Sequence, residues 1–287
     1  MASPKVPRWR LWLSLLGQTI DQGFEDNIPH LGAALAFYAL LSVLPMLVLL
    51  TSLATALYGT EIAREQIYQL ALKFAGHEQA ETIRGLLDAV SQHAYVGSKT
   101  AFFNFAILIY GASNFFTHLR GDLNFIWKTP ALPGTAFIHI LKENLLSFLM
   151  VLAIGVTVIA SILANTFLTI MIHFTIGFMP ALSGLMQIAN LFLDFFVLVC
   201  AFALTFKFVP DKKSAWSDIR GGAILTACLF TAGQYAIRFY LSHALFLIGY
   251  GAAGSIVALL IWIYYCVQIF FFGAEFIHIY SHTHTSG

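Results

Sequence analysis

Residues 31–59, LGAALAFYALLSVLPMLVLLTSLATALYG, decide the class of fold. The stretch contains no Asp, Glu, Lys or Arg, and it is longer than the roughly 20 apolar residues that a helix needs to cross a bilayer. Pro45 lies near its middle and predicts a kink, because a proline inside a helix removes a backbone hydrogen bond. We expect this stretch to form a transmembrane helix.

The rest of the chain repeats this apolar pattern. Hydrophobic residues make up 59% of the chain and charged residues 10%, whereas about a quarter of the residues in a soluble domain are charged. Prolines and glycines separate five further apolar stretches, near 101–116, 145–174, 182–206, 221–245 and 251–272. The sequence therefore predicts an all-α bundle of six transmembrane helices, with residues 1–287 forming a single integral membrane domain.

Three segments outside these stretches have patterns of their own. Residues 9–24 place leucine and isoleucine on one helical stripe, so we expect residues 1–29 to form an interfacial amphipathic helix followed by a turn. Residues 59–99 have helical apolar spacing in two halves separated by Gly76, which predicts an amphipathic helical hairpin outside the membrane. The last residues, 281–287, are expected to be a mobile tail.

Basic residues indicate how the bundle is oriented. The gaps after the third and fifth predicted helices contain no Lys or Arg, whereas the alternate gaps are basic, and the long hairpin has charges of both signs. The positive-inside rule therefore places both termini in the cytoplasm and the hairpin on the opposite side. The basic residues of the alternate gaps are Lys5, Arg8, Arg10, Arg120, Lys128, Lys142, Lys207, Lys212, Lys213 and Arg220.

Several classes of partner and cofactor are not expected. The net charge of +1 provides no broad basic surface for nucleic acid, and no nucleotide-binding loop is present. The three cysteines lie apart in apolar stretches and show no metal-binding spacing. Glu275 and His278 form a single Glu-x-x-His pair, whereas a di-iron bundle needs two. We expect no metal and no cofactor, with membrane lipids as partners; the oligomeric state stays open.

Polar side chains within the fourth and fifth predicted helices are candidates for a substrate pathway. A charge at membrane depth is costly and usually faces a bundle interior or a water-filled cavity. Helical spacing places Gln187, Asn190 and Asp194 along one helix, and Gln234 and Arg238 along the next. Asp194 and Arg238 could pair only to fix helix packing, or the two polar stripes could line a pathway for an amphipathic molecule.

Acidic residues near the cytoplasmic ends are a second group of candidates. Glu275 lies at the inner end of the sixth helix, where it could bind a proton or a cation, or form a salt bridge with Lys207 or Arg220. Glu25 and Asp26 lie with His30 just before the first helix. That group could sense protons or contact basic head groups, or it could be a solvated start of a helix.

Four stretches resemble one family in the same order along the chain. They are LGAALAFYALLSVLPMLVLL (31–50), YGASNFFTHLRGDLNFIW (110–127), KFVPDKKSAWSDIRGGAI (207–224) and YGAAGSIVALLIWIYYCVQIFFFGAEFIHIY (250–280). Together they resemble the YihY/BrkB family of bacterial inner-membrane proteins. The resemblance implies six membrane helices and an inner-membrane location. It also implies links to serum resistance, to envelope or lipid traffic and, under an older label, to a ribonuclease.

The sequence and the resemblance together favour a transporter, or a transport accessory, for an amphipathic envelope molecule such as a lipid. The alternative is a membrane scaffold or partner subunit that transports nothing. We expect no enzymatic activity. A ribonuclease is less expected because the cytoplasmic segments are short and lack an HxHxDH-like metal cluster. An intramembrane serine protease is less expected because residues 111–114, GASN, lack the final glycine of a GxSG turn.

Overall fold

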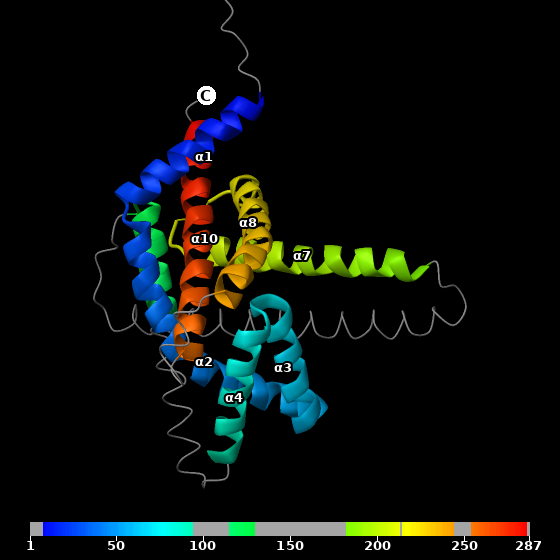
Figure 1. Ribbon diagram of the computed structural model, residues 1–287. Helices are drawn as coiled ribbons and strands as arrows, with labels where there is room; N and C mark the ends of the chain where they lie inside the picture. Colours follow the sequence, from blue (N-terminus) through cyan, green and yellow to red (C-terminus); the bar gives the residue numbers. More distant parts are fainter. Residues whose placement is uncertain (1–7, 94–114, 130–181, 213, 244–253, 286–287) are drawn as a thin grey trace, which may run out of the picture.

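The computed structural model describes residues 8–93, 115–129, 182–212, 214–243 and 254–285, and within these ranges all regular secondary structure is helical (Figure 1). The all-α prediction is confirmed for this part of the chain. Residues 115–126 are helical. The other helices are α1 (Arg8–Glu25), α2 (Ile28–Tyr58), α3 (Thr60–Ala75), α4 (His77–His93), α7 (Leu182–Phe208), α8 (Trp216–Ser242) and α10 (Gly254–Thr285).

The long helix α10 forms the axis on which α1, α2 and α8 pack (Figure 1). Within the described residues, α7 and α10 contain spans long and apolar enough to cross a membrane, Leu191–Phe208 and Gly254–Thr283, and α2 begins with the shorter apolar run Ile28–Val43. The predicted second crossing lies mostly, and the third wholly, outside the described residues. The number of crossings therefore stays a prediction.

Helix α2 begins after a sharp turn and bends along its length. Asn27 has a left-handed backbone (φ 54°), and Pro29 lies in the first turn, where the missing N–H of a proline is tolerated. The helix continues through Pro45, and its ribbon changes direction (Figure 1). A bend is what an interior proline predicts.

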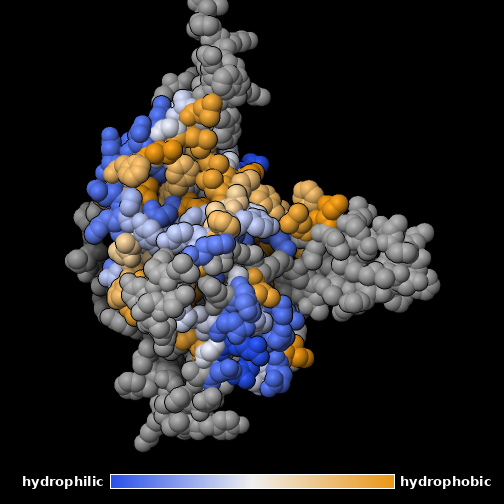
Figure 2. Space-filling view, in the orientation of Figure 1, coloured by the Kyte–Doolittle hydropathy of each residue, from blue (hydrophilic) through white to orange (hydrophobic). Residues whose placement is uncertain are grey.

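Helices α3 and α4 form a hairpin at the end of the molecule opposite α1 (Figure 1). Gly76 joins them with a positive φ of 93°, a conformation that favours glycine. Ile67 and Leu87 pack against Leu47 of α2. The outer face is polar, and Figure 2 shows a hydrophilic surface over the hairpin. There, Arg64 Nη2 lies 2.6 Å from the Asp88 carboxylate.

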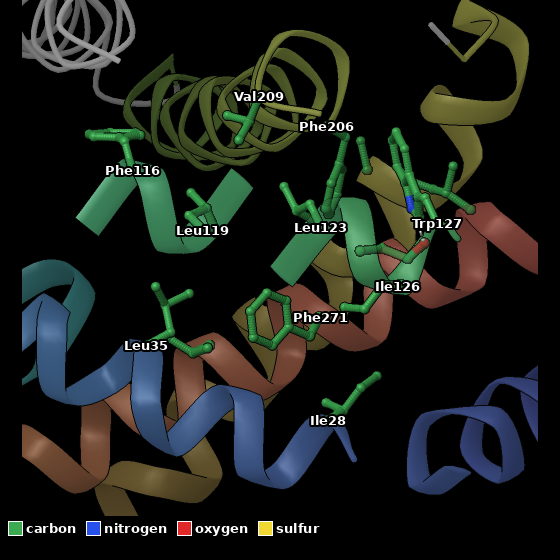
Figure 3. Close-up of a cluster of buried hydrophobic side chains, with 14 of the residues drawn as sticks. Ile28, Leu35, Phe116, Leu119, Leu123, Ile126, Trp127, Phe206, Val209 and Phe271 are labelled. Carbon is green, nitrogen blue, oxygen red and sulfur yellow. Dashed lines mark hydrogen bonds between the residues drawn. The ribbon is translucent and has the colours of Figure 1, made fainter. Parts of the chain in front are cut away.

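The core gathers around α10 where α2, residues 115–126 and α7 meet it (Figure 3). Phe206 of α7 and Phe271 of α10 are fully buried, and Leu35 comes from α2. Trp127 is also buried, and its Nε1–H donates a hydrogen bond of 2.9 Å to the carbonyl of Ala274. This hydrogen bond joins residues 127–129 to the last third of α10.

Helix α10 extends into the segment that was expected to be a tail. Residues 281–285 continue the helix, whereas a mobile tail was expected over 281–287; residues 286–287 lie outside the described part. Local contacts explain the longer helix. The Ser281 hydroxyl donates to the carbonyl of His278 (2.8 Å), and the Thr283 hydroxyl donates to the carbonyl of Tyr280 (2.9 Å). No glycine or proline interrupts residues 274–285.

Candidate functional site: an apolar pocket beside a buried carboxylate

A pocket of about 420 Å³ lies between α1, the start of α2, α8 and α10. Its volume falls within the range of about 300–1,000 Å³ that is typical of small-molecule sites. Four helices therefore build a cavity of ligand size. Its lining residues are Thr19, Ile20, Gly23, Phe24, Ile28, Pro29, Leu229, Gln268, Ile269 and Phe272.

The wall of this pocket is chiefly apolar. Two of the lining side chains are polar, and each has a partner within the protein. The Thr19 hydroxyl donates to the carbonyl of Leu15 (2.7 Å), and the Gln268 amide lies 3.5 Å from the carbonyl of Ile28. An occupant therefore meets mainly methyl groups and aromatic rings.

The pocket is open along the α1 side. Phe24 is 70% exposed and Ile20 is 49% exposed, although both side chains line the cavity. Residues at such a rim are reached from the surface without unfolding of the core. The pocket can therefore exchange its contents with the surroundings of the protein.

A buried carboxylate lies one helical turn beyond the pocket along α10. Glu275 is fully buried, and neither of its carboxylate oxygens has a hydrogen-bond partner among the described residues. The Trp127–Ala274 hydrogen bond brings Lys128 and Thr129 to this level of α10. Lys128 Nζ in turn lies 3.9 Å from Asp26 Oδ1. We call Asp26, Lys128, Thr129 and Glu275 the Glu275 cluster.

The neighbours of Glu275 differ from those expected from the sequence. Lys207 Nζ donates to the carbonyl of Ser214 (2.7 Å) and lies 5.4 Å from the centre of the Trp216 ring. Arg220 Nε donates to the carbonyl of Trp216 (3.2 Å). Within the described part of the chain, neither basic side chain forms the expected salt bridge with Glu275. The α7–α8 loop uses these side chains for its own contacts.

The two predicted pathway residues whose side chains the structure describes do not line the pocket. Asp194 on α7 and Gln234 on α8 are half-buried, and neither lines the cavity. Gln187, Asn190 and Arg238 lie on the same two helices, with side chains outside the described set. The first half of α7, where Asp194 lies, projects away from α10 (Figure 1). Pairing of Asp194 with Arg238 therefore stays a prediction.

A polar clamp fixes the α7–α8 loop to residues 115–126. The Asp211 carboxylate accepts hydrogen bonds from the Arg120 guanidinium (Nε, 3.1 Å) and from the Asn124 amide (2.6 Å). Asn124 also accepts a hydrogen bond of 2.9 Å from the backbone N–H of Asp211. Arg120 Nη2 forms a salt bridge with the same carboxylate. The clamp holds this end of the bundle together on the side opposite the hairpin.

The stability of the protein should depend on pH through Asp122, which follows the predicted second crossing. Burial raises the pKa of Asp122 to about 6, above the value of about 3.9 expected in the unfolded chain. The folded state therefore binds a proton at Asp122 more tightly than the unfolded chain does. The stabilisation of the folded state by this proton is fully present below about pH 4 and is lost as the pH rises through about 6. Asp122→Asn should raise the Tm in detergent relative to wild type more at pH 7 than at pH 4.5.

Asp21→Asn is the matched control for Asp122→Asn, because Asp21 is an exposed carboxylate on α1. Its Tm difference from wild type should be similar at the two pH values. Equal pH dependence in wild type and Asp122→Asn would contradict a buried acid at this position.

Comparison with known proteins identifies the family of this chain. The family model described as Virulence factor BrkB matches residues 19–287, nearly the whole chain. The chain belongs to the BrkB family. The matched range includes every residue of the pocket and of the Glu275 cluster.

Similar BrkB-family proteins occur in several bacteria and are named membrane proteins. A UPF0761 membrane protein of Vibrio cholerae is 27% identical over 272 residues, covering 93% of this chain and 86% of the relative. One from Prosthecochloris aestuarii is 27% identical, covering 88% of this chain and 58% of the relative. One from Bordetella petrii is 25% identical, covering 95% of this chain and 60% of the relative. No solved structure matches the chain.

Proposed function

We propose that this BrkB-family protein transports, or helps to transport, an amphipathic envelope molecule whose apolar part occupies the pocket between α1 and α10. A membrane lipid is the proposed occupant. The apolar, open pocket of about 420 Å³ is the observation that carries the proposal. The activity proposed is movement of the molecule, with no covalent step and hence no enzymatic role.

The chemistry of the pocket supports a lipid tail as the part that is bound. Ile20, Phe24 and Phe272 offer apolar surface from two helices, and the polar groups of the wall are already hydrogen bonded. Removal of an acyl chain from the bilayer gains little hydrophobic energy, so affinity would come from close packing. The rim at Phe24 gives a tail access from the side.

The proposed location is the bacterial inner membrane, with both termini in the cytoplasm. Lys128 follows the second predicted crossing, and Lys207 and Lys212 follow the fourth, so all three belong to the basic gaps between the predicted crossings. The positive-inside rule then puts those gaps in the cytoplasm and the hairpin in the periplasm.

A translocation assay with the purified full chain in vesicles tests this proposal. Fluorescent phospholipids of several head-group classes are incorporated, and a membrane-impermeant reagent quenches the outer leaflet. We expect the protein to speed the movement of at least one class. Ile269→Trp should slow it several-fold, because the indole ring fills the pocket. Ile256→Trp is the control, since Ile256 is exposed on the same helix and does not line the pocket.

Two results would count against transport. One is the absence of movement for every lipid class while a known lipid-translocating protein is active in parallel vesicles. This result would favour the scaffold or partner subunit instead. The other is equal movement with Ile269→Trp and wild type, which would separate transport from the pocket.

A further inference from the structure

We propose that the Glu275 cluster binds one monovalent cation, either a proton or an alkali metal ion, and that this cation holds one wall of the pocket in place. The coupling to the pocket rests on the function proposed above, whereas cation binding itself does not. The cluster lies where three separate segments of the chain meet.

Hydrogen-bond and ion-pair contacts fix these segments together. The Trp127 indole donates to the carbonyl of Ala274, the residue before Glu275, and the charges of Asp26 and Lys128 both act on Glu275. Lys128 Nζ lies 3.9 Å from Asp26 Oδ1 in the turn between α1 and α2. Lys128 also has a left-handed backbone (φ 50°), so the chain turns sharply at this point. The α1–α2 turn, residues 127–129 and α10 therefore form one local site.

Three residues of the cluster have buried oxygen atoms without partners in the described part of the chain. Both carboxylate oxygens of Glu275, Asp26 Oδ2 and Thr129 Oγ1 are inaccessible and have no hydrogen-bond partner among the described residues. Glu275 as a whole is fully buried. Such groups are rare in proteins, and each needs a compensating ion or donor. Oxygen ligands suit alkali and other hard cations, and a carboxylate also takes a proton.

The charges of the cluster indicate how large the missing charge is. Asp26 and Glu275 supply two carboxylates, and Lys128 supplies one ammonium group that is about half exposed. One positive charge more would balance the cluster. The described residues contain no group of three or more His, Cys, Asp or Glu side chains suited to a metal ion, which disfavours a transition-metal site. A single monovalent cation supplies the one missing charge and does not need a cluster of three such side chains.

Other ionisable groups face the same region. His278 is buried one turn further along α10, and its Nδ1 has no partner in the described part of the structure. Its ring lies 4.7 Å from that of His282. Lys212 of the α7–α8 loop and Lys128 act electrostatically on His278. These groups can also respond to acid, so a test of Glu275 needs a variant at Glu275 itself.

The link to the pocket runs through the α1–α2 turn. Phe24, Ile28 and Pro29 line the pocket and flank Asp26 in sequence, and Phe272 lines it one turn before Glu275. A cation between the two carboxylates draws the turn towards α10. Without that charge, repulsion between Asp26 and Glu275 pushes the turn away. The occupied site therefore holds this wall in the position that forms the pocket with α10.

The test measures the Tm of the purified full chain in lipid nanodiscs under two conditions. Sodium chloride replaces choline chloride at constant ionic strength and pH 8 in one series, and the pH falls without sodium in the other. We expect at least one series to raise the Tm of wild type by about 5 °C. Because protonation of Asp122 also stabilises the protein in acid, the acid series is run in the Asp122→Asn background. Glu275→Gln should lose that rise in both series. Glu25→Gln should keep it, because Glu25 is the exposed neighbour of Asp26.

The cation site is overturned if neither series raises the Tm of wild type, or if Glu275→Gln responds as wild type does. The series that gives the rise distinguishes an alkali metal ion from a proton. If Glu275→Gln does not fold, Asp26→Asn takes its place in the comparison with wild type. The Tm rise of wild type itself is measured without any variant.

A photoreactive phospholipid separates this inference from the proposed function. With a diazirine on its acyl chain, it should label residues 19–29 and 268–272 more strongly when the favoured cation is present. Labelling that is equal with and without the cation overturns the coupling and leaves the proposed function standing. Absence of labelling in both conditions overturns the proposed function, whatever the Tm shows.

Discussion

Gly222→Leu is expected to prevent stable packing of α8 against α10, while Gly221→Leu, one residue earlier, should leave the protein folded. A Cβ atom at Gly222 would overlap the Ile277 side chain and approach the carbonyl oxygen of Gly273 at 3.4 Å, whereas at Gly221 it would meet nothing within 4 Å. The severe overlap is with the Ile277 side chain, which is buried and has little room to move, so the larger leucine side chain must push α8 and α10 apart. We expect the free energy of unfolding of Gly222→Leu to fall by about 3 kcal/mol or more and its Tm to fall by roughly 10 °C.

Size-exclusion profiles and thermal melts in detergent would test this pair of variants. Gly222→Ala should lie between wild type and Gly222→Leu, because its single methyl group already meets Ile277. Equal melting of Gly221→Leu and Gly222→Leu would show that α8 and α10 do not pack through this surface.

Asp211→Ala is the second substitution with a large expected effect. It leaves the Arg120 guanidinium, which is 15% exposed, without its carboxylate, and it removes the acceptor of the Asn124 amide. The pair is half-buried, so the loss of free energy of unfolding lies between the roughly 1 kcal/mol of an exposed pair and the roughly 3–5 kcal/mol of a buried one, at about 2–3 kcal/mol. The α7–α8 loop should also detach from residues 115–126.

Asp88→Ala provides the contrast, because Asp88 pairs with Arg64 on the outer face of the α3–α4 hairpin and is 54% exposed. An exposed pair contributes at most about 1 kcal/mol. Thermal melts of both variants, with limited proteolysis near residue 211, would measure the difference. Equal destabilisation by the two substitutions would contradict the clamp.

Several helices were predicted correctly because their bounds depend on local sequence patterns, namely apolar spacing and a glycine. The stripe over residues 9–24 corresponds to α1, which spans Arg8–Glu25, and Gly76 separates α3 from α4. The apolar stretch 182–206 corresponds to α7, which ends at Phe208. The start of α8 at Trp216 was missed because Asp218 and Arg220 interrupt the apolar pattern before Gly221.

The pocket could not be predicted because it depends on packing between distant segments. Thr19, Leu229 and Phe272 lie on three helices, and nothing in their spacing places them together. The polar stripes containing Asp194 and Gln234 suggested a cavity elsewhere, and these residues do not line this one.

The Glu275 cluster was predicted in part. A carboxylate at the end of an apolar helix identified Glu275, and Asp26 was noted beside the first helix. Their shared site depends on the Trp127–Ala274 hydrogen bond, which connects residues 147 positions apart. No local pattern could have indicated that Thr129 joins them.

The central claim, that the pocket between α1 and α10 holds an acyl chain, is tested most directly by mapping where a diazirine-tailed phospholipid attaches to the full chain in nanodiscs. We predict that attachment concentrates on residues 19–29 and 268–272, and that Ile269→Trp removes it while Ile256→Trp does not. Attachment at Phe192 and Phe196, exposed on α7, to the same extent as at the pocket would contradict the claim.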